Sequence, residues 1–209
     1  MAHSGPFRCQ CGQIHADIFD GPSNDLLPYI DLDGVSAMNA TEAAAARRIF
    51  RPHDQRLDRS ASLKSEEDDP QLLIHIPFTC PVKIRALTVI GGSDGLAPRE
   101  LKAYINKEAF DISDAEQTNP VQEWTLQEDP NGVIEYPTQF SKFQNVSKLS
   151  LFVNDNHGGD HTLISYIGLN GIGTNHQRRA VQCVYESRGV GSLNDPMKED
   201  AAGKSKMGM

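Results

Sequence analysis

The chain has 209 residues and a formal net charge of -8 at pH 7, so nonspecific attraction to nucleic acid or to an anionic membrane surface is unfavourable. Hydrophobic residues make up 38% of the chain, enough for one buried core, and no run approaches the roughly 20 apolar residues of a membrane-spanning helix. The cysteines are spaced too irregularly for a disulfide framework, which favours a reducing compartment. We therefore expect a soluble, cytoplasmic protein with one substantial domain.

The N-terminal part of the chain predicts a tail, a short strand and one helix. Residues 1–25 are polar and interrupted by Gly and Pro, which indicates a flexible tail. The sequence LLPYI at 26–30 is interpreted as a short strand. The stretch TEAAAARRIF predicts the only good helix, over 41–50, because its four consecutive alanines favour helix and Asn39 or Thr41 could serve as the N-cap.

A strand-rich region follows an almost wholly polar segment, 53–70, which we predict to be an exposed loop. Short apolar segments alternate with turn sequences such as GGSDG and DPNG. The predicted strands lie at 71–76, 83–90, 101–106, 122–127, 133–136, 148–153, 163–169 and 180–185. Since no helical pattern separates them, an antiparallel β-sandwich or jelly roll is favoured over a parallel sheet. Residues 187–209 are poor in apolar side chains and are predicted to be a disordered tail.

The first of these strands has the clearest pattern. Strand side chains alternate with period 2, which puts Leu72, Ile74 and Ile76 on one face and Leu73 and His75 on the other. The proline that follows has no backbone N–H to donate, so it should mark an edge, a bulge or the end of the strand. This segment therefore predicts the entry into a sheet and contains no catalytic chemistry.

Two polar segments are candidate binding sites. The first is an acidic run that could steer a basic partner, although a solvated charge run is the simpler interpretation. It consists of Glu66, Glu67, Asp68 and Asp69. The second is the loop NDNHGGDH, whose oxygen-rich side chains could bind calcium or a sugar hydroxyl; the alternative is a solvated turn. Its candidate residues are Asp155, Asn156, His157 and Asp160.

The N-terminal segment contains four side chains of the types that bind zinc. They are His3, Cys9, Cys11 and His15. Their spacing is not that of a standard zinc finger, and a tail with incidental ligand types is the alternative, so we assign no metal or other cofactor. The run GGSDG at 91–95 has GxSxG spacing, but no helical pattern follows it as a nucleophile elbow requires, and the CxC pair lacks a helix that could activate a thiol. We therefore expect no catalytic activity.

Several long stretches resemble one family when they are taken together. They are YIDLDGVSAMN, RIFRPHDQRLDRS, LLIHIPFTCPVKIRALTVIGG, KFQNVSKLSLFVNDNHGG and TLISYIGLNG. In order and spacing they resemble the PITH-domain family, named for the proteasome-interacting C-terminal half of a thioredoxin-like protein. The likeness spans Leu26 to Gly173 and continues more weakly to Glu186, which gives a domain at 26–186.

The resemblance implies a jelly-roll sandwich similar to galactose-binding domains, without established enzymatic activity. It also implies a cytosolic and nuclear protein that associates with the regulatory particle of the proteasome. No thioredoxin domain precedes residue 26 and no CGPC motif occurs, so reductase activity is not carried over. We expect a noncatalytic protein-interaction module. The alternatives are a sandwich that binds a glycan or metal ion, or a structural subunit of another large assembly such as a cytoskeletal one.

Overall fold

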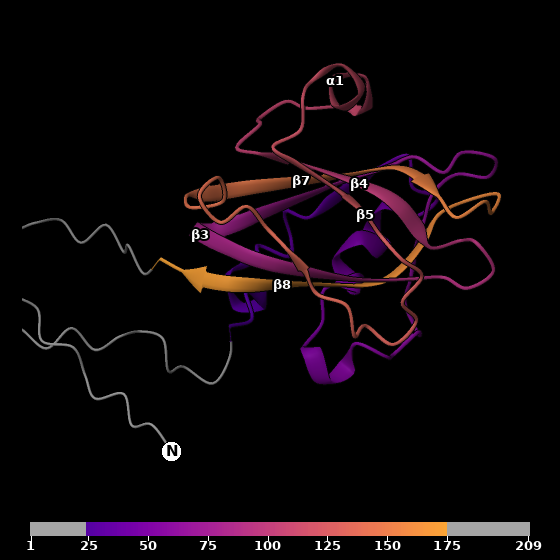
Figure 1. Ribbon diagram of the computed structural model, residues 1–209, viewed down its shortest axis with the longest axis horizontal. Coiled ribbons are helices and arrows are strands. Elements are labelled where there is room, and N and C mark those ends of the chain that lie inside the picture. Colours follow the sequence, from indigo (N-terminus) through magenta and orange to yellow (C-terminus); the bar gives the residue numbers. More distant parts are fainter. Residues whose placement is uncertain (1–23, 175–209) are drawn as a thin grey trace, which may run out of the picture. The chain divides into compact units, whose positions relative to one another are not determined.

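The computed structural model of the protein describes residues 24–174 (Figure 1). The predicted strand at 180–185, the predicted C-terminal tail and nearly all of the predicted N-terminal tail lie outside these residues. The strands are β1 (Ser36–Met38), β2 (Leu63–Lys64), β3 (Leu72–Gly91), β4 (Pro98–Ile105), β5 (Gln122–Thr125), β6 (Tyr136–Pro137), β7 (Val146–Asn156) and β8 (Leu163–Gly173). The helices are the 3₁₀-helices η1 (Leu27–Tyr29), η2 (Ala43–Ile49) and η3 (His53–Gln55) and the α-helix α1 (Ile112–Gln117).

β3 takes part in both layers of an antiparallel sandwich. Its first part pairs with β1 and β7, and its second part pairs with β8 and β6. The pairing with β7 shifts register between Pro77 and Val82, as expected where a proline removes a donor from the ladder. β4 and β5 extend the β7 side, and β2 extends the β8 side. The predicted antiparallel sandwich of jelly-roll type is therefore confirmed, with strands 71–76 and 83–90 joined into one.

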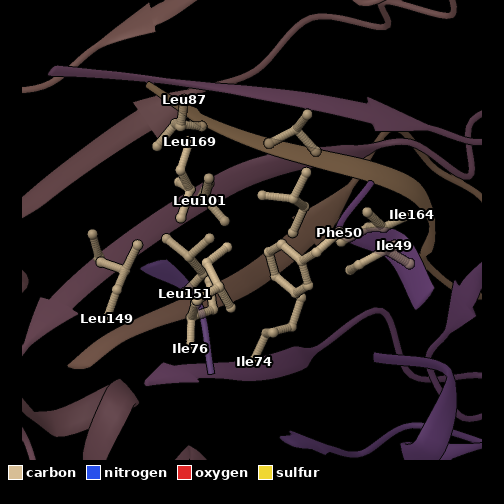
Figure 2. Packing of buried hydrophobic residues seen from close by; sticks show 14 of the residues in the cluster. Ile49, Phe50, Ile74, Ile76, Leu87, Leu101, Leu149, Leu151, Ile164 and Leu169 are labelled. Atoms are coloured by element: carbon tan, nitrogen blue, oxygen red, sulfur yellow. The ribbon is translucent and has the colours of Figure 1, made fainter. Parts of the chain in front are cut away.

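The main core lies between the two layers and consists mostly of aliphatic side chains from the inner faces of the strands, together with residues of η2 and a few aromatic side chains. Figure 2 labels Ile49, Phe50, Ile74, Ile76, Leu87, Leu101, Leu149, Leu151, Ile164 and Leu169. Leu72, Ile74 and Ile76 all belong to this cluster, whereas Leu73 does not. The predicted period-2 alternation of this strand is therefore confirmed.

The outer face of the β7 layer is covered as well, because α1 packs on it (Figure 1). A second apolar cluster lies there and contains Leu73, Tyr104, Phe110, Ala115 and Phe152. The helix begins with a capping box, in which Asp111 accepts a hydrogen bond from the backbone N–H of Asp114 at 2.8 Å and the Asp114 carboxylate accepts from the Asp111 N–H at 3.2 Å. The prediction of a single helix at 41–50 missed this element.

Two predictions near the N-terminus were wrong. Segment 26–30 is not a strand, because Leu27–Tyr29 forms the 3₁₀-turn η1 with a proline in its first positions. The helix predicted at 41–50 is the 3₁₀-helix η2, and neither predicted cap residue caps it. The Asn39 amide donates to the carbonyl oxygen of Gln71 at 2.7 Å, and the Thr41 hydroxyl donates to that of Ser65 at 3.0 Å. Tertiary contacts therefore took the groups that would have capped an α-helix.

The segment predicted as an exposed loop at 53–70 is not wholly exposed. It contains β2, in which Leu63 is fully buried and pairs with Ile164 of β8. The predicted strand at 133–136 is also corrected, because only Tyr136–Pro137 pairs with β3. A single apolar residue in a polar stretch gives no periodic signal, so only the packing of β8 reveals the role of Leu63.

Candidate interaction surface

The structure brings the two predicted binding segments together at one edge of the sandwich. Ser65 follows β2 and precedes the acidic run, and Thr162 follows the NDNHGGDH loop. The backbone N–H of Ser65 donates to the Thr162 carbonyl oxygen at 2.9 Å, and the N–H of Thr162 donates to the Ser65 hydroxyl at 2.9 Å. The Thr162 hydroxyl in turn donates to the carbonyl oxygen of Pro70 at 2.6 Å. Buried hydrogen bonds therefore fix the acidic run beside the loop.

The acidic run leaves most of its charge in solvent. Glu66, Glu67 and Asp68 are exposed, and their carboxylates have no partner among residues 24–174. Asp69 is half-buried, and its carboxylate accepts a hydrogen bond from the backbone N–H of Gln71 at 2.9 Å. Three of the four predicted acidic groups are thus available to a basic partner, and that role stays a prediction.

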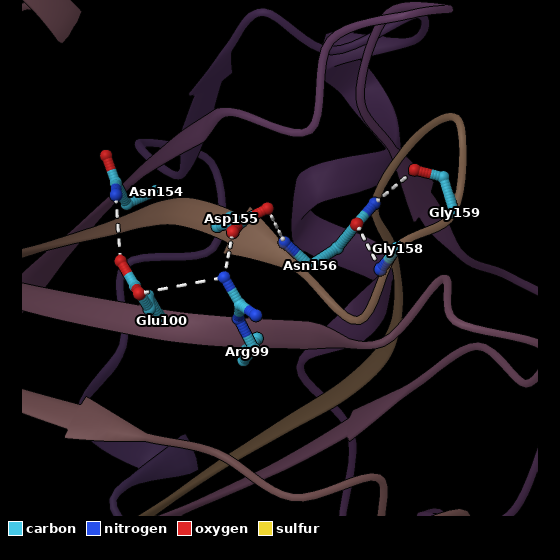
Figure 3. A network of polar contacts seen from close by, with 7 residues as sticks. All are labelled: Arg99, Glu100, Asn154, Asp155, Asn156, Gly158 and Gly159. Atoms are coloured by element: carbon cyan, nitrogen blue, oxygen red, sulfur yellow. Dashed lines mark hydrogen bonds and ion pairs between the residues drawn. The ribbon is translucent and has the colours of Figure 1, made fainter.

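An ion pair and several hydrogen bonds tie the NDNHGGDH loop to β4, as Figure 3 shows. The Asp155 carboxylate pairs with the Arg99 guanidinium and also accepts from the backbone N–H of Asn156 at 2.8 Å. The Asn154 amide donates to the Glu100 carboxylate at 2.9 Å. The Asp155 carboxylate therefore already has a cationic partner and a backbone hydrogen-bond donor within the protein.

Asn156 holds the loop in shape from inside, since only 3% of its surface is exposed. Its side-chain oxygen accepts from the backbone N–H of Gly158 at 2.9 Å, and its amide donates to the carbonyl oxygens of Gly159 and His161 at 2.9 and 3.0 Å (Figure 3). Asp160 is exposed. Hydrogen bonds thus engage Asn156, and a ligand role for the loop stays a prediction.

Metal-ligand geometry is not found in the part of the chain that the structure covers. Within residues 24–174, no group of three or more His, Cys, Asp or Glu side chains is placed to hold a metal ion. The four zinc candidates His3, Cys9, Cys11 and His15 lie outside the described residues. The zinc hypothesis for them stays untested.

The sequence interpretation missed two adjoining hollows that lie beside η2 and β2. The larger hollow, of about 340 Å³, is lined by Arg48, Lys64 and hydroxyl side chains. The smaller one, of about 190 Å³, is lined by Arg59, Leu96 and Leu163. Ser62 lines both. The signal that could have indicated them is a cluster of basic residues over 41–64 in an otherwise acidic chain.

Arg51 lies next to the smaller hollow, and only 11% of its side chain is exposed. Its guanidinium donates to the carbonyl oxygen of Ser165 at 2.5 Å and pairs with Asp58 at 3.3 Å, while its buried Nε has no partner among residues 24–174. Hydrogen bonds from the backbone and hydroxyl of Ser60, together with the Arg51 charge, hold the pKa of Asp58 below its usual value.

A buried histidine on β3 adds a titratable group inside the domain. Only 7% of the His75 surface is exposed, and its Nδ1 forms a hydrogen bond with the Ser150 hydroxyl over 2.8 Å. Burial lowers the pKa of His75, because an imidazolium would lose its hydration there, and the positive charge of Lys148 lowers it further. His75 is therefore a structural polar group of the sheet.

A family model described as the PITH domain matches residues 16–189. The chain belongs to the PITH domain family. It is 34% identical to PITH domain-containing protein 1 of Dictyostelium discoideum, over 90% of this chain and 91% of that protein. The identity is 37% to the Mus musculus protein of that name and 36% to the Homo sapiens one, each covering 88% of this chain and 86% of the relative. The resemblance inferred from the sequence is confirmed.

Solved structures similar to this PITH domain include carbohydrate-binding modules. The family 32 CBM from C. perfringens NanJ in complex with galactose has a TM-score of 0.46 and 12% identity, covering 68% of this chain and 96% of that one. The CBM32-1 and CBM32-2 domains from Clostridium perfringens ZmpB have a TM-score of 0.49 and 10% identity, covering 69% and 36%. None of the helices described is long and apolar enough to cross a membrane.

Proposed function

We propose that this PITH domain protein is a noncatalytic interaction module that docks onto a larger protein assembly, with the regulatory particle of the proteasome as its first candidate partner. The observation that carries the proposal is the family match over residues 16–189, since the family takes its name from proteasome interaction. The proposed location is the cytoplasm, with the nucleus as a second compartment.

The surface described above supports an interaction role. Hydrogen bonds from Ser65, Asn156 and Thr162 hold the loops at the sandwich edge, so a partner would not have to order them. Exposed charges of both signs lie on this rigid support, at Glu66–Asp68 and at Lys64. Complementary charges steer encounter and select partners, which suits a docking module.

The glycan- and ion-binding alternatives gain no support from the loop that suggested them. Asp155 is paired with Arg99, and the Asn156 side chain makes its hydrogen bonds within the loop. Both side chains thus already serve contacts within the protein, and Asn156 is buried. We therefore propose no second function for that loop.

Affinity purification of the tagged full-length chain from native lysate, with quantitative mass spectrometry, tests the proposal. Subunits of the proteasome regulatory particle should be enriched over a tag-only control. A variant with Glu66→Lys, Glu67→Lys and Asp68→Asn should fold normally, since these side chains are exposed and unpaired within residues 24–174 and Asn tolerates the positive φ at position 68, and it shows whether the acidic run contributes. Enrichment no greater than with the tag alone would overturn the assignment of this partner.

A further inference from the structure

We propose that the two adjoining hollows beside η2 and β2 form one binding site for a peptide segment that carries an acidic side chain next to an apolar one. The inference deepens the proposed function, because it names the chemistry of the partner that such a module would hold. Ser62 lines both hollows, and its hydroxyl has no hydrogen-bond partner among residues 24–174. One peptide segment can therefore contact both hollows across Ser62.

The charge of the surrounding segment opposes that of the chain. Residues 41–64 contain six Lys or Arg residues and three Asp or Glu residues, a net charge of +3, whereas the whole chain carries -8. The hollows themselves are lined by Arg48, Arg59 and Lys64 against a single carboxylate, Glu42. This local excess of positive charge favours an anionic group in the site.

Two of the three cations are available to a ligand. The exposed Lys64 ammonium has no ion pair or side-chain hydrogen bond within the described residues. The exposed Arg59 guanidinium donates to the carbonyl oxygen of Pro130 at 3.0 Å, which uses one of its five N–H groups. Arg48 pairs with Glu42 at the surface, an exposed contact that an incoming carboxylate can exchange with at little cost. Lys64 and Arg48 line the larger hollow, which is thus suited to a carboxylate, and Arg59 lines the smaller one.

The smaller hollow is suited to an apolar side chain. Leu96 and Leu163 line it together with Gly92, and both leucines are only partly buried. A Cβ on Gly92 would lie 2.9 Å from the Cβ of Leu96 and 3.2 Å from that of Leu163, so the absence of a side chain here keeps the floor open. Burying an apolar side chain against this floor would add about 1.5–3 kcal/mol of favourable transfer free energy before ordering costs.

The positive charge of Arg51, next to the smaller hollow, strengthens the preference of the site for an anionic group. Arg51 is fixed by its hydrogen bond to the carbonyl oxygen of Ser165, which lines the smaller hollow, and Asp58 partly neutralises it. Because most of this guanidinium is buried, solvent screens its field less than that of an exposed cation. The site therefore combines the buried, hydrogen-bonded Arg51 with exposed cations in the lining of the hollows.

A peptide fits these features better than a nucleic acid does. Nucleic-acid affinity depends on many phosphate contacts, and no aromatic side chain lines either hollow to stack a base. A free anion would leave the leucine-lined hollow unused. An acidic side chain beside an apolar one uses both hollows, which is the way Arg clusters and pockets recognise acidic motifs.

Fluorescence anisotropy with the full-length chain tests the site. The probe is a labelled peptide containing Leu-Glu-Asp-Leu-Glu between Gly-Ser linkers, and saturable binding with a Kd below about 1 mM is expected. Replacing the probe's leucines by serine, or its acidic residues by lysine, should weaken binding at least about tenfold. Oligothymidine and inorganic phosphate, as separate probes, should bind more weakly than the peptide.

Variants of the chain assign the binding to the hollows. Lys64→Glu and Ser62→Trp should each weaken peptide binding at least about tenfold, the first by reversing charge and the second by placing a large side chain at the residue that lines both hollows. Lys107→Glu is the matched control, since it reverses an exposed lysine beyond the far end of β4 and should leave the affinity unchanged.

Four results would overturn the inference: no saturable binding, equal binding of the lysine peptide, tighter binding of oligothymidine, or full affinity in Lys64→Glu. If the peptide does not bind while regulatory-particle subunits still co-purify, this site is wrong and the proposed function stands. If the peptide binds at the hollows while no such subunits co-purify, the proteasome assignment is wrong and the site stands.

Discussion

The loop at 154–161 and the segment at 41–64 are both rich in polar side chains, yet the structure uses them differently. In the loop, the side chains of Asp155 and Asn156 form their ion pair and hydrogen bonds within the protein itself. In the segment, most N–H groups of the Lys64 and Arg59 side chains have no partner among residues 24–174, and both residues line the hollows. A dense run of polar residues therefore does not by itself indicate a binding site, because folding can pair side chains such as Asp155 and Asn156 within the protein.

The largest expected effect comes from removing the side chain that holds the loop. Asn156→Ala should lower the free energy of unfolding by about 2–4 kcal/mol, because three hydrogen bonds are lost and the loop's carbonyl oxygens lose a buried donor. Urea-induced unfolding measures this. Asp160→Ala in the same loop is the control and should change stability by less than about 0.5 kcal/mol, since Asp160 is exposed. Equal effects of the two substitutions would remove the structural role assigned to Asn156.

Arg51 is the exception within the basic segment, because it is buried and hydrogen-bonded. Arg51→Ala should destabilise the fold by about 1.5–3 kcal/mol, the usual range for a hydrogen bond made by a charged group. Arg47→Ala should cost less than about 0.5 kcal/mol, because the Arg47 and Asp33 side chains are 60% and 96% exposed and lie 3.9 Å apart. Thermal unfolding compares the two variants, and a loss at Arg47 as large as that at Arg51 would contradict this distinction.

The buried His75 predicts a dependence of stability on pH that neither polar region causes. Its pKa in the folded state is lowered from 6.5 by burial, so the unfolded state binds the proton more tightly. Its contribution to stability is therefore complete above about pH 6.5 and is lost as the pH falls through the folded-state pKa. Unfolding of the wild type and of His75→Gln between about pH 8 and pH 5 measures this. A loss of stability at low pH that is the same in both proteins would show that another group causes it.

The smallest expected effect on stability is at the proposed binding site itself. Lys64→Glu should change the free energy of unfolding by less than about 0.5 kcal/mol, because the side chain is exposed and unpaired within the described part of the chain. Urea-induced unfolding beside Lys107→Glu checks this. A loss above about 1 kcal/mol would mean that Lys64 supports the fold, and its effect on peptide binding would then need a charge-neutral variant.

The sheet could be predicted from the sequence where the residue pattern is local. The alternation of Leu72, Ile74 and Ile76 indicated the strand and its inner face, and the order of strands over 98–173 followed from similar patterns. The short α-helix left a local signal too, in the capping box at Asp111 and Asp114, which was not used. Local sequence patterns were therefore enough to predict most of the strands.

Two other errors came from contacts between residues far apart in the sequence. Asn39 and Thr41 match the preferred types of a helix N-cap, but their side chains bind the carbonyl oxygens of Gln71 and Ser65. The candidate site was missed for the same reason, since the smaller hollow exists only where Arg59 and Ser62 meet Leu96 and Leu163. No spacing rule in the sequence brings those residues together.

The contrast between the two polar regions can be tested most directly by titrating the ¹⁵N-labelled full-length chain with the Leu-Glu-Asp-Leu-Glu peptide and following the backbone amide resonances. The amides of Ser62, Lys64 and Leu96 should shift in a saturable way, while those of Asp155 and Asn156 should stay in place. Shifts confined to Asp155 and Asn156, with the amides around Ser62 unchanged, would contradict the assignment of the free binding groups to the basic segment.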